Sequence, residues 1–239
     1  LLPVAGVLAV YVYAAFDAFW LARKAQQDYR LKDYNRPGVY LLLVVVYLIC
    51  PISLVAAVRQ FAYEAFYIPS ASMSPSIVSG DRVLVNKMRP RRSYPARGSL
   101  IVFRNPESDG GFAFVKRVVA VAGDRVVIQG DEVSINGRTL TRDRLPLDAL
   151  GPLSREIEGE AYMEENAGSR YKVLVTDTDP GADVDVVVPE RSVFVLGDNR
   201  NISRDSRHFG SIHLGDVIGY VDYIFYPATD WSRFGVCDE

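Results

Sequence analysis

An uncharged apolar run from Pro37 to Val58, 22 residues long, constrains this chain more than any other feature. A helix needs about 20 apolar residues to cross a bilayer, and a run this long with no polar face is more typical of lipid than of a soluble core. We therefore predict a transmembrane helix at 37–58. The stretch 1–21 carries one charge, Asp17, and is predicted as a first transmembrane helix. It lacks the basic start of a signal peptide, and a second span follows it.

The segment between these spans, 22–36, holds five basic and two acidic residues. By the positive-inside rule, a short basic loop of this kind is cytoplasmic. Both ends of the predicted two-helix hairpin then face the other side of the membrane, and the whole of 59–239 lies there with them. We predict a multi-pass membrane protein, with 59–239 on the trans side of the membrane.

From Gly80 onward the sequence changes to short alternating apolar runs separated by turn residues. Such runs predict β-strands, and we expect them at 81–85, 99–103, 112–121, 125–129, 132–135, 171–176, 192–196 and 217–226. The predicted fold class is mainly β: an all-β domain that is barrel-like or built from two packed sheets. The acidic, turn-rich stretch 146–168 is predicted as a short surface insertion within this domain.

Composition argues against several classes of function. The formal net charge is -2, so no nucleic-acid partner is expected. Cys50 and Cys237 lie far apart and lack the spacing of a disulfide framework or a metal site. The only histidines are His208 and His213, which makes a histidine-rich metal centre an unfavourable interpretation. We therefore predict neither a metal nor an organic cofactor.

The serine-rich turn 67–76 is the first candidate for chemistry. Pro69 and Pro75 enclose Ser70 and Ser72, which indicates a stiff, exposed turn. Taken alone, an ordinary Ser/Pro linker explains this stretch equally well. A hydrolase would need a base for such a serine, and both histidines lie in turn-like sequence late in the chain. A Ser-His-Asp triad is therefore not credible, and a lysine base remains.

Lys116 is the candidate base. It lies within the apolar predicted strand 112–121, either on a solvated face, which is the commoner situation for lysine, or desolvated against the core. Desolvation would lower the pKa of its ammonium group, as a base that works near neutral pH requires. The polar stretch 197–210 is either an ordinary charged surface loop or the source of a hydroxyl, from Ser203 or Ser206, that orients the lysine.

Four ordered motifs resemble those of the type I signal peptidases (leader peptidases), a family of membrane-anchored serine endopeptidases with a Ser-Lys dyad. The motifs are Ile68–Ser76, Gly80–Lys87, Arg97–Phe103 continuing to Val115–Val119 and Gly123-Asp124, and Gly197–Gly210. The resemblance covers roughly residues 60–227, and four motifs in a fixed order make it specific. The predicted membrane hairpin, reached by separate reasoning, agrees with it.

The resemblance implies catalytic roles for four residues. Ser72 would be the nucleophile and Lys116 the general base. The Ser70 hydroxyl and the Ser72 main-chain amide would form the oxyanion hole, each donor being worth about 3 kcal/mol in the transition state. Ser203 would hydrogen-bond the Lys116 amine and aim it. Four charged residues would support the site, the last two as a pair that holds its loop: Arg117, Asp198, Asp205 and Arg207.

The resemblance also implies a substrate. Ile68 and Val115 would help to line a shallow pocket for small side chains, so that signal peptides are removed from exported preproteins after Ala-x-Ala-like sequences. The expected partners are preprotein signal peptides and membrane lipid, and the enzyme is expected to work as a monomer. No cofactor is implied.

The sequence departs from the family pattern at a few positions. Ala71 stands where glycine is usual, Ser76 where threonine is usual, and Ser99 where aspartate is common. The short insertion indicates that the second β-subdomain of some members is reduced, and Cys237 has no evident disulfide partner. Two alternatives remain open: a specialised relative with a narrow, pilin- or conjugation-type substrate, and a catalytically silent, membrane-tethered, peptide-binding β-domain.

Overall fold

The computed structural model describes residues 13, 16–17, 20, 37–88, 95–105, 112–155, 159–176 and 183–237. Nearly all of the predicted first span, 1–21, and the whole of the predicted loop 22–36 lie outside the described residues, so both stay predictions. The chain divides into two compact units, Leu1–Val55 and Ala56–Glu239.

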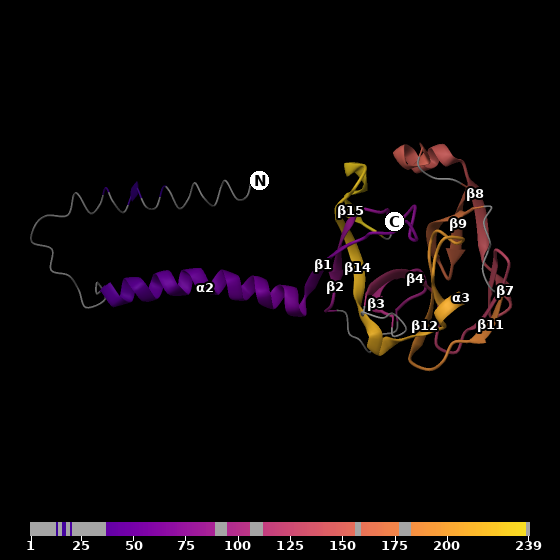
Figure 1. Cartoon of the computed structure of the whole chain (residues 1–239), viewed down its shortest axis with the longest axis horizontal. Coiled ribbons are helices and arrows are strands. Elements are labelled where there is room, and N and C mark those ends of the chain that lie inside the picture. The colour runs from indigo at the N-terminus through magenta and orange to yellow at the C-terminus, as the bar shows by residue number, and fades with distance from the viewer. Residues whose placement is uncertain are drawn as a thin grey trace, which may run out of the picture. The chain divides into compact units, whose positions relative to one another are not determined.

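Helix α2, Pro37–Phe61, contains the long apolar run (Figure 1). Its segment Leu41–Phe61 has a mean hydropathy of 2.9 and exposed side chains. Among the described residues it is the helix long and apolar enough to cross a membrane. The predicted span 37–58 lies within α2, which continues to Phe61 and places Arg59 in its last turn. The predicted boundary at residue 59 therefore falls inside the helix.

The part of the chain after α2 is mainly β. Its strands are β1 Tyr63–Tyr67, β2 Arg82–Asn86, β3 Leu100–Arg104, β4 Ala113–Val121, β5 Arg125–Gln129, β6 Glu132–Ile135, β7 Arg138–Thr139, β8 Thr141–Leu145, β9 Glu160–Asn166, β10 Ser169–Val175, β11 Val184–Val187, β12 Ser192–Leu196, β13 Ile212–His213, β14 Val217–Tyr226 and β15 Gly235–Val236. The helical turns are η1 Leu147–Arg155, α3 Ser206–Phe209, η2 Leu214–Asp216 and η3 Trp231–Arg233.

In the described residues these strands form three antiparallel sheets (Figure 1). The largest has the order β1-β2-β14-β3-β4-β12-β13, with β15 added to β14. A second sheet has the order β11-β5-β6-β7, and a third has the order β10-β9-β8. The prediction of a mainly β domain is thus confirmed.

Strand β3 lies inside the large sheet and is apolar on both faces. Leu100 and Val102 belong to one apolar cluster, and Ile101 and Phe103 belong to another. All four side chains are buried, which explains why the strand reads as a continuous apolar run rather than an alternating one. Lys116 on β4 pairs in register with Ile101, so the lysine emerges from a strand whose neighbour is packed on both sides.

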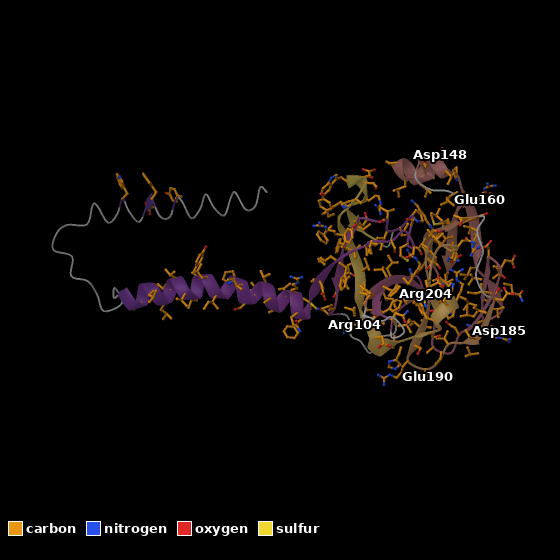
Figure 2. The ribbon with its side chains drawn as sticks, in the orientation of Figure 1. Arg104, Asp148, Glu160, Asp185, Glu190 and Arg204 are labelled. Atoms are coloured by element: carbon orange, nitrogen blue, oxygen red, sulfur yellow. The ribbon has the colours of Figure 1, made fainter. Side chains whose placement is uncertain are left out.

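The two smaller sheets each complete a further apolar cluster. Val126 of β5 packs with Phe194 of β12, which joins the four-stranded sheet to the large one. Ala161 of β9 and Leu174 of β10 pack with Leu153 of η1. Charged side chains such as Arg104, Asp185 and Glu190 stay on the outside of this β domain (Figure 2).

The insertion predicted at 146–168 stays a prediction, but the stretch is not an irregular surface loop. This stretch contains η1 and β9, and β9 is the middle strand of its sheet. The sequence of β9, EAYMEEN, suggests a solvated loop because three of its seven residues are glutamates. However, Glu164 and Asn166 are buried, and both are held by hydrogen bonds. Polar pattern alone cannot distinguish a solvated carboxylate from a buried carboxylate with partners.

Candidate active site

The serine-rich turn leaves the large sheet between β1 and β2 and is anchored by its apolar residues. Ile68, Met73 and Ile77 are buried in one apolar cluster. At the base of the loop, the Ile68 amide donates to the Asp81 carbonyl at 2.9 Å. This anchoring leaves Ser72 half-buried at the surface of the domain.

Lys116 reaches the serine from β4. Its Nζ donates a hydrogen bond of 2.5 Å to Ser72 Oγ, and the side chain is almost completely buried. Burial lowers the pKa of Lys116 from 10.5 to about 8; the charges of Asp205 and Asp198 oppose this shift, and that of Arg207 adds to it. The neutral amine that this pKa makes accessible can accept the Ser72 proton, which is what a general base must do.

Ser70 lies beside the Ser72 hydroxyl, on the side that faces solvent. Its Oγ is 3.3 Å from Ser72 Oγ, and the residue is exposed. A hydroxyl in this place is close enough to donate to an oxyanion that forms on a carbonyl attacked by Ser72.

Ser203 does not make the hydrogen bond to Lys116 that the resemblance implies. Its Oγ is buried and makes no hydrogen bond of good geometry, while the Lys116 amine bonds to Ser72. The Ser203 side chain interacts with the Asp205 carboxylate and helps to lower its pKa. Instead, Ser203 packs against Gly197, where an added Cβ would lie 2.2 Å from Ser203 Oγ and 2.6 Å from the Ser72 carbonyl oxygen. The expected hydrogen bond is thus replaced by tight packing beside the nucleophile.

Asp205 organises the loop that carries Ser203. Its carboxylate accepts from Arg207 Nε and Nη2, both at 2.9 Å, and from the Gly197 amide at 2.9 Å. It also caps the N-terminus of α3 by accepting from the Arg207 amide. Burial would raise the pKa of Asp205, but the hydrogen bond and charge of Arg207 hold it below its ordinary value. Arg204, which lies between Ser203 and Asp205 in the sequence, is exposed.

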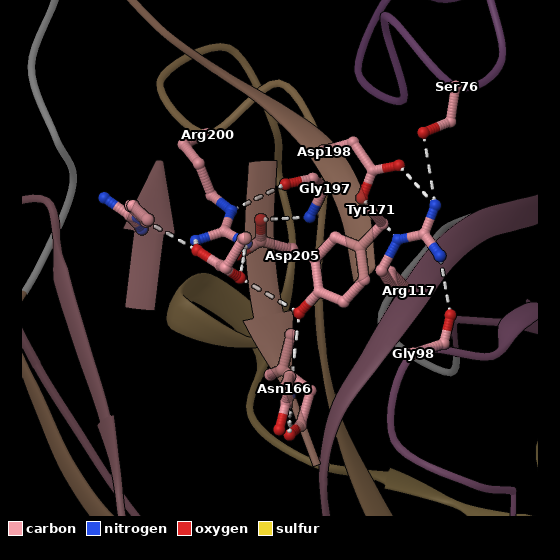
Figure 3. Close-up of polar contacts among 12 residues, drawn as sticks. Ser76, Gly98, Arg117, Asn166, Tyr171, Gly197, Asp198, Arg200 and Asp205 are labelled. Carbon is pink, nitrogen blue, oxygen red and sulfur yellow. Dashed lines mark hydrogen bonds and ion pairs between the residues drawn. The ribbon is translucent and has the colours of Figure 1, made fainter. Parts of the chain in front are cut away.

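Arg117 and Asp198 form a second buried ion pair behind the site (Figure 3). Arg117 Nε and Nη2 each donate to the Asp198 carboxylate at 2.7 Å. The remaining guanidinium donors reach the Gly98 carbonyl at 2.6 Å and Ser76 Oγ at 3.2 Å. One ion pair therefore connects the strand of Lys116 with the last motif and with the serine turn.

Ile68 and Val115 pack against the same apolar cluster, one buried and the other partly buried. A groove of about 850 Å³ in the described part of the chain is lined by other residues, among them Pro75, Gly98 and Leu153. A substrate pocket at Ile68 and Val115 therefore stays a prediction.

Sequence reasoning missed two residues that hold the serine turn. The Asp81 carboxylate is buried and accepts from Arg233 Nη1 and Nη2, at 3.0 and 2.7 Å, and from the Val78 amide at 2.8 Å. Arg233 also donates to the Ser76 carbonyl at 3.1 Å. The Gly80-Asp81 pair belongs to a recognised motif and could have indicated a structural carboxylate, but nothing local indicates that Arg233 is its partner.

No cluster of three or more His, Cys, Asp or Glu side chains suited to a metal ion occurs among the described residues. The arrangement is instead a serine hydroxyl beside a buried lysine amine, with a second hydroxyl next to it. Together with a mainly β scaffold, this defines a class: serine hydrolases that use lysine as their base.

Comparison with known proteins specifies the class. Residues 40–226 match the family described as "Signal peptidase, peptidase S26". The chain is 34% identical to "Probable signal peptidase I-1" of Synechocystis sp., over 74% of this chain and 78% of that protein. It is 31% identical to the signal peptidase I of Bacillus caldolyticus, over 76% of this chain and 89% of that protein. A solved signal peptidase I from Enterococcus faecalis V583 is 27% identical, with a TM-score of 0.37, and the match covers 54% of this chain and 97% of that one. The chain therefore belongs to the S26 family of signal peptidases.

Proposed function

We propose that this chain is a signal peptidase I, a membrane-anchored serine endopeptidase that removes N-terminal signal peptides from exported preproteins after Ala-x-Ala-like sites. The observation that carries the proposal is the contact of 2.5 Å between Lys116 Nζ and Ser72 Oγ. Membership of the S26 family supports it. No cofactor enters the proposed reaction.

In the proposed mechanism, Ser72 Oγ attacks the scissile carbonyl carbon while its proton passes to Lys116 Nζ. The tetrahedral oxyanion is stabilised by the Ser70 hydroxyl and the Ser72 main-chain amide. Collapse breaks the peptide bond, and Lys116 gives its proton to the new amino terminus of the mature protein. Water then attacks the acyl-enzyme with Lys116 again as base, which releases the signal peptide and restores Ser72.

The remaining predicted residues support this chemistry. Ile68 and Val115 are proposed to help line the pocket that selects small side chains. The ion pair of Arg117 with Asp198 supports the proposal because it connects the strand of Lys116 to the last motif. The ion pair of Asp205 with Arg207 supports it because it holds the loop that carries Ser203. We propose that the Ser203 hydroxyl lies near Lys116 in the resting enzyme without a hydrogen bond to it, and that such a bond forms only during the reaction.

The membrane arrangement is also part of the proposal. We propose a two-helix hairpin formed by 1–21 and 37–58, joined by the cytoplasmic loop 22–36, in a bacterial inner membrane. The barrel-like catalytic domain, 59–239, then works as a monomer on the periplasmic or extracytoplasmic side. The apolar helix α2 supports the second span. Contact with lipid confines the enzyme to the surface where cleavage sites emerge.

The test is cleavage of a purified preprotein by the full chain in lipid or detergent, comparing the wild type with Ser72→Ala and Lys116→Ala. Lys172→Ala, on the half-buried Lys172 of β10, is the matched lysine control. We expect cleavage after an Ala-x-Ala-like site by the wild type and the control only. Cleavage that survives Lys116→Ala would remove the proposed base. A folded wild type that cuts no preprotein would favour the silent peptide-binding alternative, and cleavage of only one substrate type would favour the specialised relative.

A further inference from the structure

Glu164 is a buried carboxylate that the proposed mechanism does not use. It lies on β9, in the middle of the three-stranded sheet, and its side chain is completely buried. The carboxylate accepts from Arg200 Nη1 at 2.8 Å and Nη2 at 2.5 Å, from Arg142 Nε at 2.7 Å and from the Tyr171 hydroxyl at 2.9 Å. Such a set of partners is needed to keep a charge in the protein interior.

Arg200, the main partner of Glu164, belongs to the last sequence motif. Its Nε donates to the Gly197 carbonyl at 3.2 Å, and its amide donates to the Leu174 carbonyl at 2.9 Å (Figure 3). Its own carbonyl accepts from Arg207 Nη2. The ion pair with Glu164 therefore fixes the segment 197–200 against the small sheet and also holds the partner of Asp205.

The segment 197–200 contacts the nucleophile directly. The Asn199 amide donates to the Ser72 carbonyl at 3.1 Å, and Gly197 has no room for a Cβ beside that same oxygen. A displacement of the segment would therefore move the main chain of Ser72. Geometry at a nucleophile matters because a misplacement of about 1 Å can cost on the order of 100-fold in rate.

Tyr171 provides a second connection from Glu164 to the site. Its hydroxyl donates to Glu164, and its ring lies against the Arg117 guanidinium, 4.3 Å from the ring centroid (Figure 3). Arg117 follows Lys116 on β4 and pairs with Asp198. Both supporting ion pairs behind the dyad are thus connected to the same carboxylate.

We propose that Glu164 is a positioning residue for the Ser-Lys dyad: through Arg200 and Tyr171 it holds the segment 197–200 that supports Ser72. The inference rests on the proposed function and adds a residue from the small sheet to its machinery. The sheet that carries β9 is thereby part of the catalytic apparatus rather than a surface addition.

Loss of the Glu164 charge has a predictable effect on the base. Arg200 and Arg142 face Glu164, whereas Asp205, Asp198 and Arg207 face Lys116. Without Glu164, the buried Arg200 guanidinium retains Asp198 as a nearby carboxylate. Removal of one buried negative charge nevertheless leaves this part of the interior more positive, which disfavours the Lys116 ammonium group. The acidic limb of the pH–rate profile should therefore move to lower pH.

The experiment compares Glu164→Gln with Glu165→Gln in the full chain in detergent. Glu165 is the adjacent residue on β9 and is exposed, so it controls for the change in charge. We expect Glu164→Gln to lower kcat on the order of 10- to 100-fold per folded molecule, with KM nearly unchanged and the acidic limb moved to lower pH. Glu164→Asp, which keeps the charge on a shorter side chain, should recover part of kcat and the wild-type limb. Thermal unfolding gives the folded fraction.

A kcat per folded molecule and a pH profile for Glu164→Gln equal to those of the control would overturn the proposal and leave Glu164 a purely structural residue. If Glu164→Gln does not fold, Tyr171→Phe replaces it, since this variant removes only the hydroxyl contact with Glu164. We expect a smaller fall in kcat and a smaller shift of the acidic limb, and the absence of both overturns the proposal.

Acylation of Ser72 by p-nitrophenyl acetate, followed by mass spectrometry, distinguishes failure of the positioning role from failure of the proposed function. In that reaction Ser72 Oγ takes the acetyl group, Lys116 takes the proton and p-nitrophenolate leaves. Slower acylation in Glu164→Gln supports the positioning role even if the wild type cuts no preprotein.

Discussion

Gly197 and Ser203 are packed against each other with no space for an additional methyl group. A Cβ built on Gly197 would lie 2.4 Å from Ser203 Cβ, well inside the contact distance of two carbon atoms. The same Cβ would lie 2.6 Å from the Ser72 carbonyl oxygen. Glycine is therefore required here by the close approach of these atoms rather than by backbone conformation. A larger residue at this position tests how closely the last motif packs against the nucleophile.

The first prediction concerns Gly197→Ala. The added methyl must push away Ser203 and the Ser72 main chain, so we expect kcat to fall on the order of 100-fold and the thermal unfolding temperature to drop. Gly38→Ala is the control, because a Cβ there meets nothing within 4 Å. Preprotein cleavage and thermal unfolding of both variants measure the effect. Normal activity in Gly197→Ala would show that the segment is not held against Ser72.

The second prediction concerns pH. Since burial lowers the pKa of Lys116 to about 8, the neutral amine that acts as base becomes populated as the pH rises through this value. We expect kcat/KM to increase tenfold per pH unit below the limb and to level off above it. Asp205 raises the pKa of Lys116, so Asp205→Asn should move the limb to lower pH. The exposed Asp148, changed to Asn, should leave it in place. A limb near pH 10.5 would contradict burial of the base.

The third prediction concerns stability. Lys116 has a pKa of 10.5 when unfolded and about 8 when folded, so between these values the unfolded chain binds more protons, and the free energy of unfolding rises with pH. Below pH 8 the buried ammonium group costs about 3 kcal/mol. Lys116→Met should therefore abolish activity but raise the unfolding temperature at pH 7, and the pH-dependent part of this gain should disappear above pH 10.5. Thermal unfolding at several pH values measures it, and a gain independent of pH would contradict the linkage.

The fourth prediction concerns Ser203. The buried Ser203 hydroxyl makes no hydrogen bond of good geometry, and its interaction with Asp205 helps to hold the pKa of that carboxyl low. Ser203→Ala should therefore raise the free energy of unfolding by at most about 1 kcal/mol. If the hydroxyl bonds to Lys116 only during the reaction, as proposed, the same variant should lower kcat while it stabilises the fold. Chemical denaturation and preprotein cleavage give the two values. A destabilised Ser203→Ala would indicate that the hydroxyl has a partner in the resting enzyme.

The sequence predicts strands well where an apolar pattern coincides with burial. The predicted ranges 125–129 and 132–135 coincide with β5 and β6, and 192–196 coincides with β12. Strands β8 and β11 were missed because exposed or charged residues dominate them. Strand β9 was missed because its buried polar residues have partners far along the chain, and no local pattern reports such partners.

The residues of the candidate site also differ in how far local sequence can indicate them. Ser72 and Lys116 were candidates because each stands in a distinctive local setting, a proline-enclosed turn and an apolar strand. The resemblance of the motifs to the type I signal peptidases implied their roles as nucleophile and base. The contact between them, and the absence of a bond from Ser203, depend on how three separate segments pack. Glu164 could not be proposed from the sequence, since a glutamate between Met163 and Glu165 has the pattern of a solvated strand until Arg200 is placed beside it.

The ion pair between Arg233 and Asp81 bears on when, during synthesis of the chain, the enzyme becomes active. Ser76 and Asp81, which anchor the serine turn, are bound by a residue that is synthesised long after the nucleophile itself. Until η3 has emerged and docked, the Asp81 carboxylate lacks its cation, and the Ser76 carbonyl lacks the hydrogen bond from Arg233. A nascent chain or a fragment that ends before Arg233 is therefore expected to remain inert, so that proteolytic activity begins only when synthesis of the domain is complete.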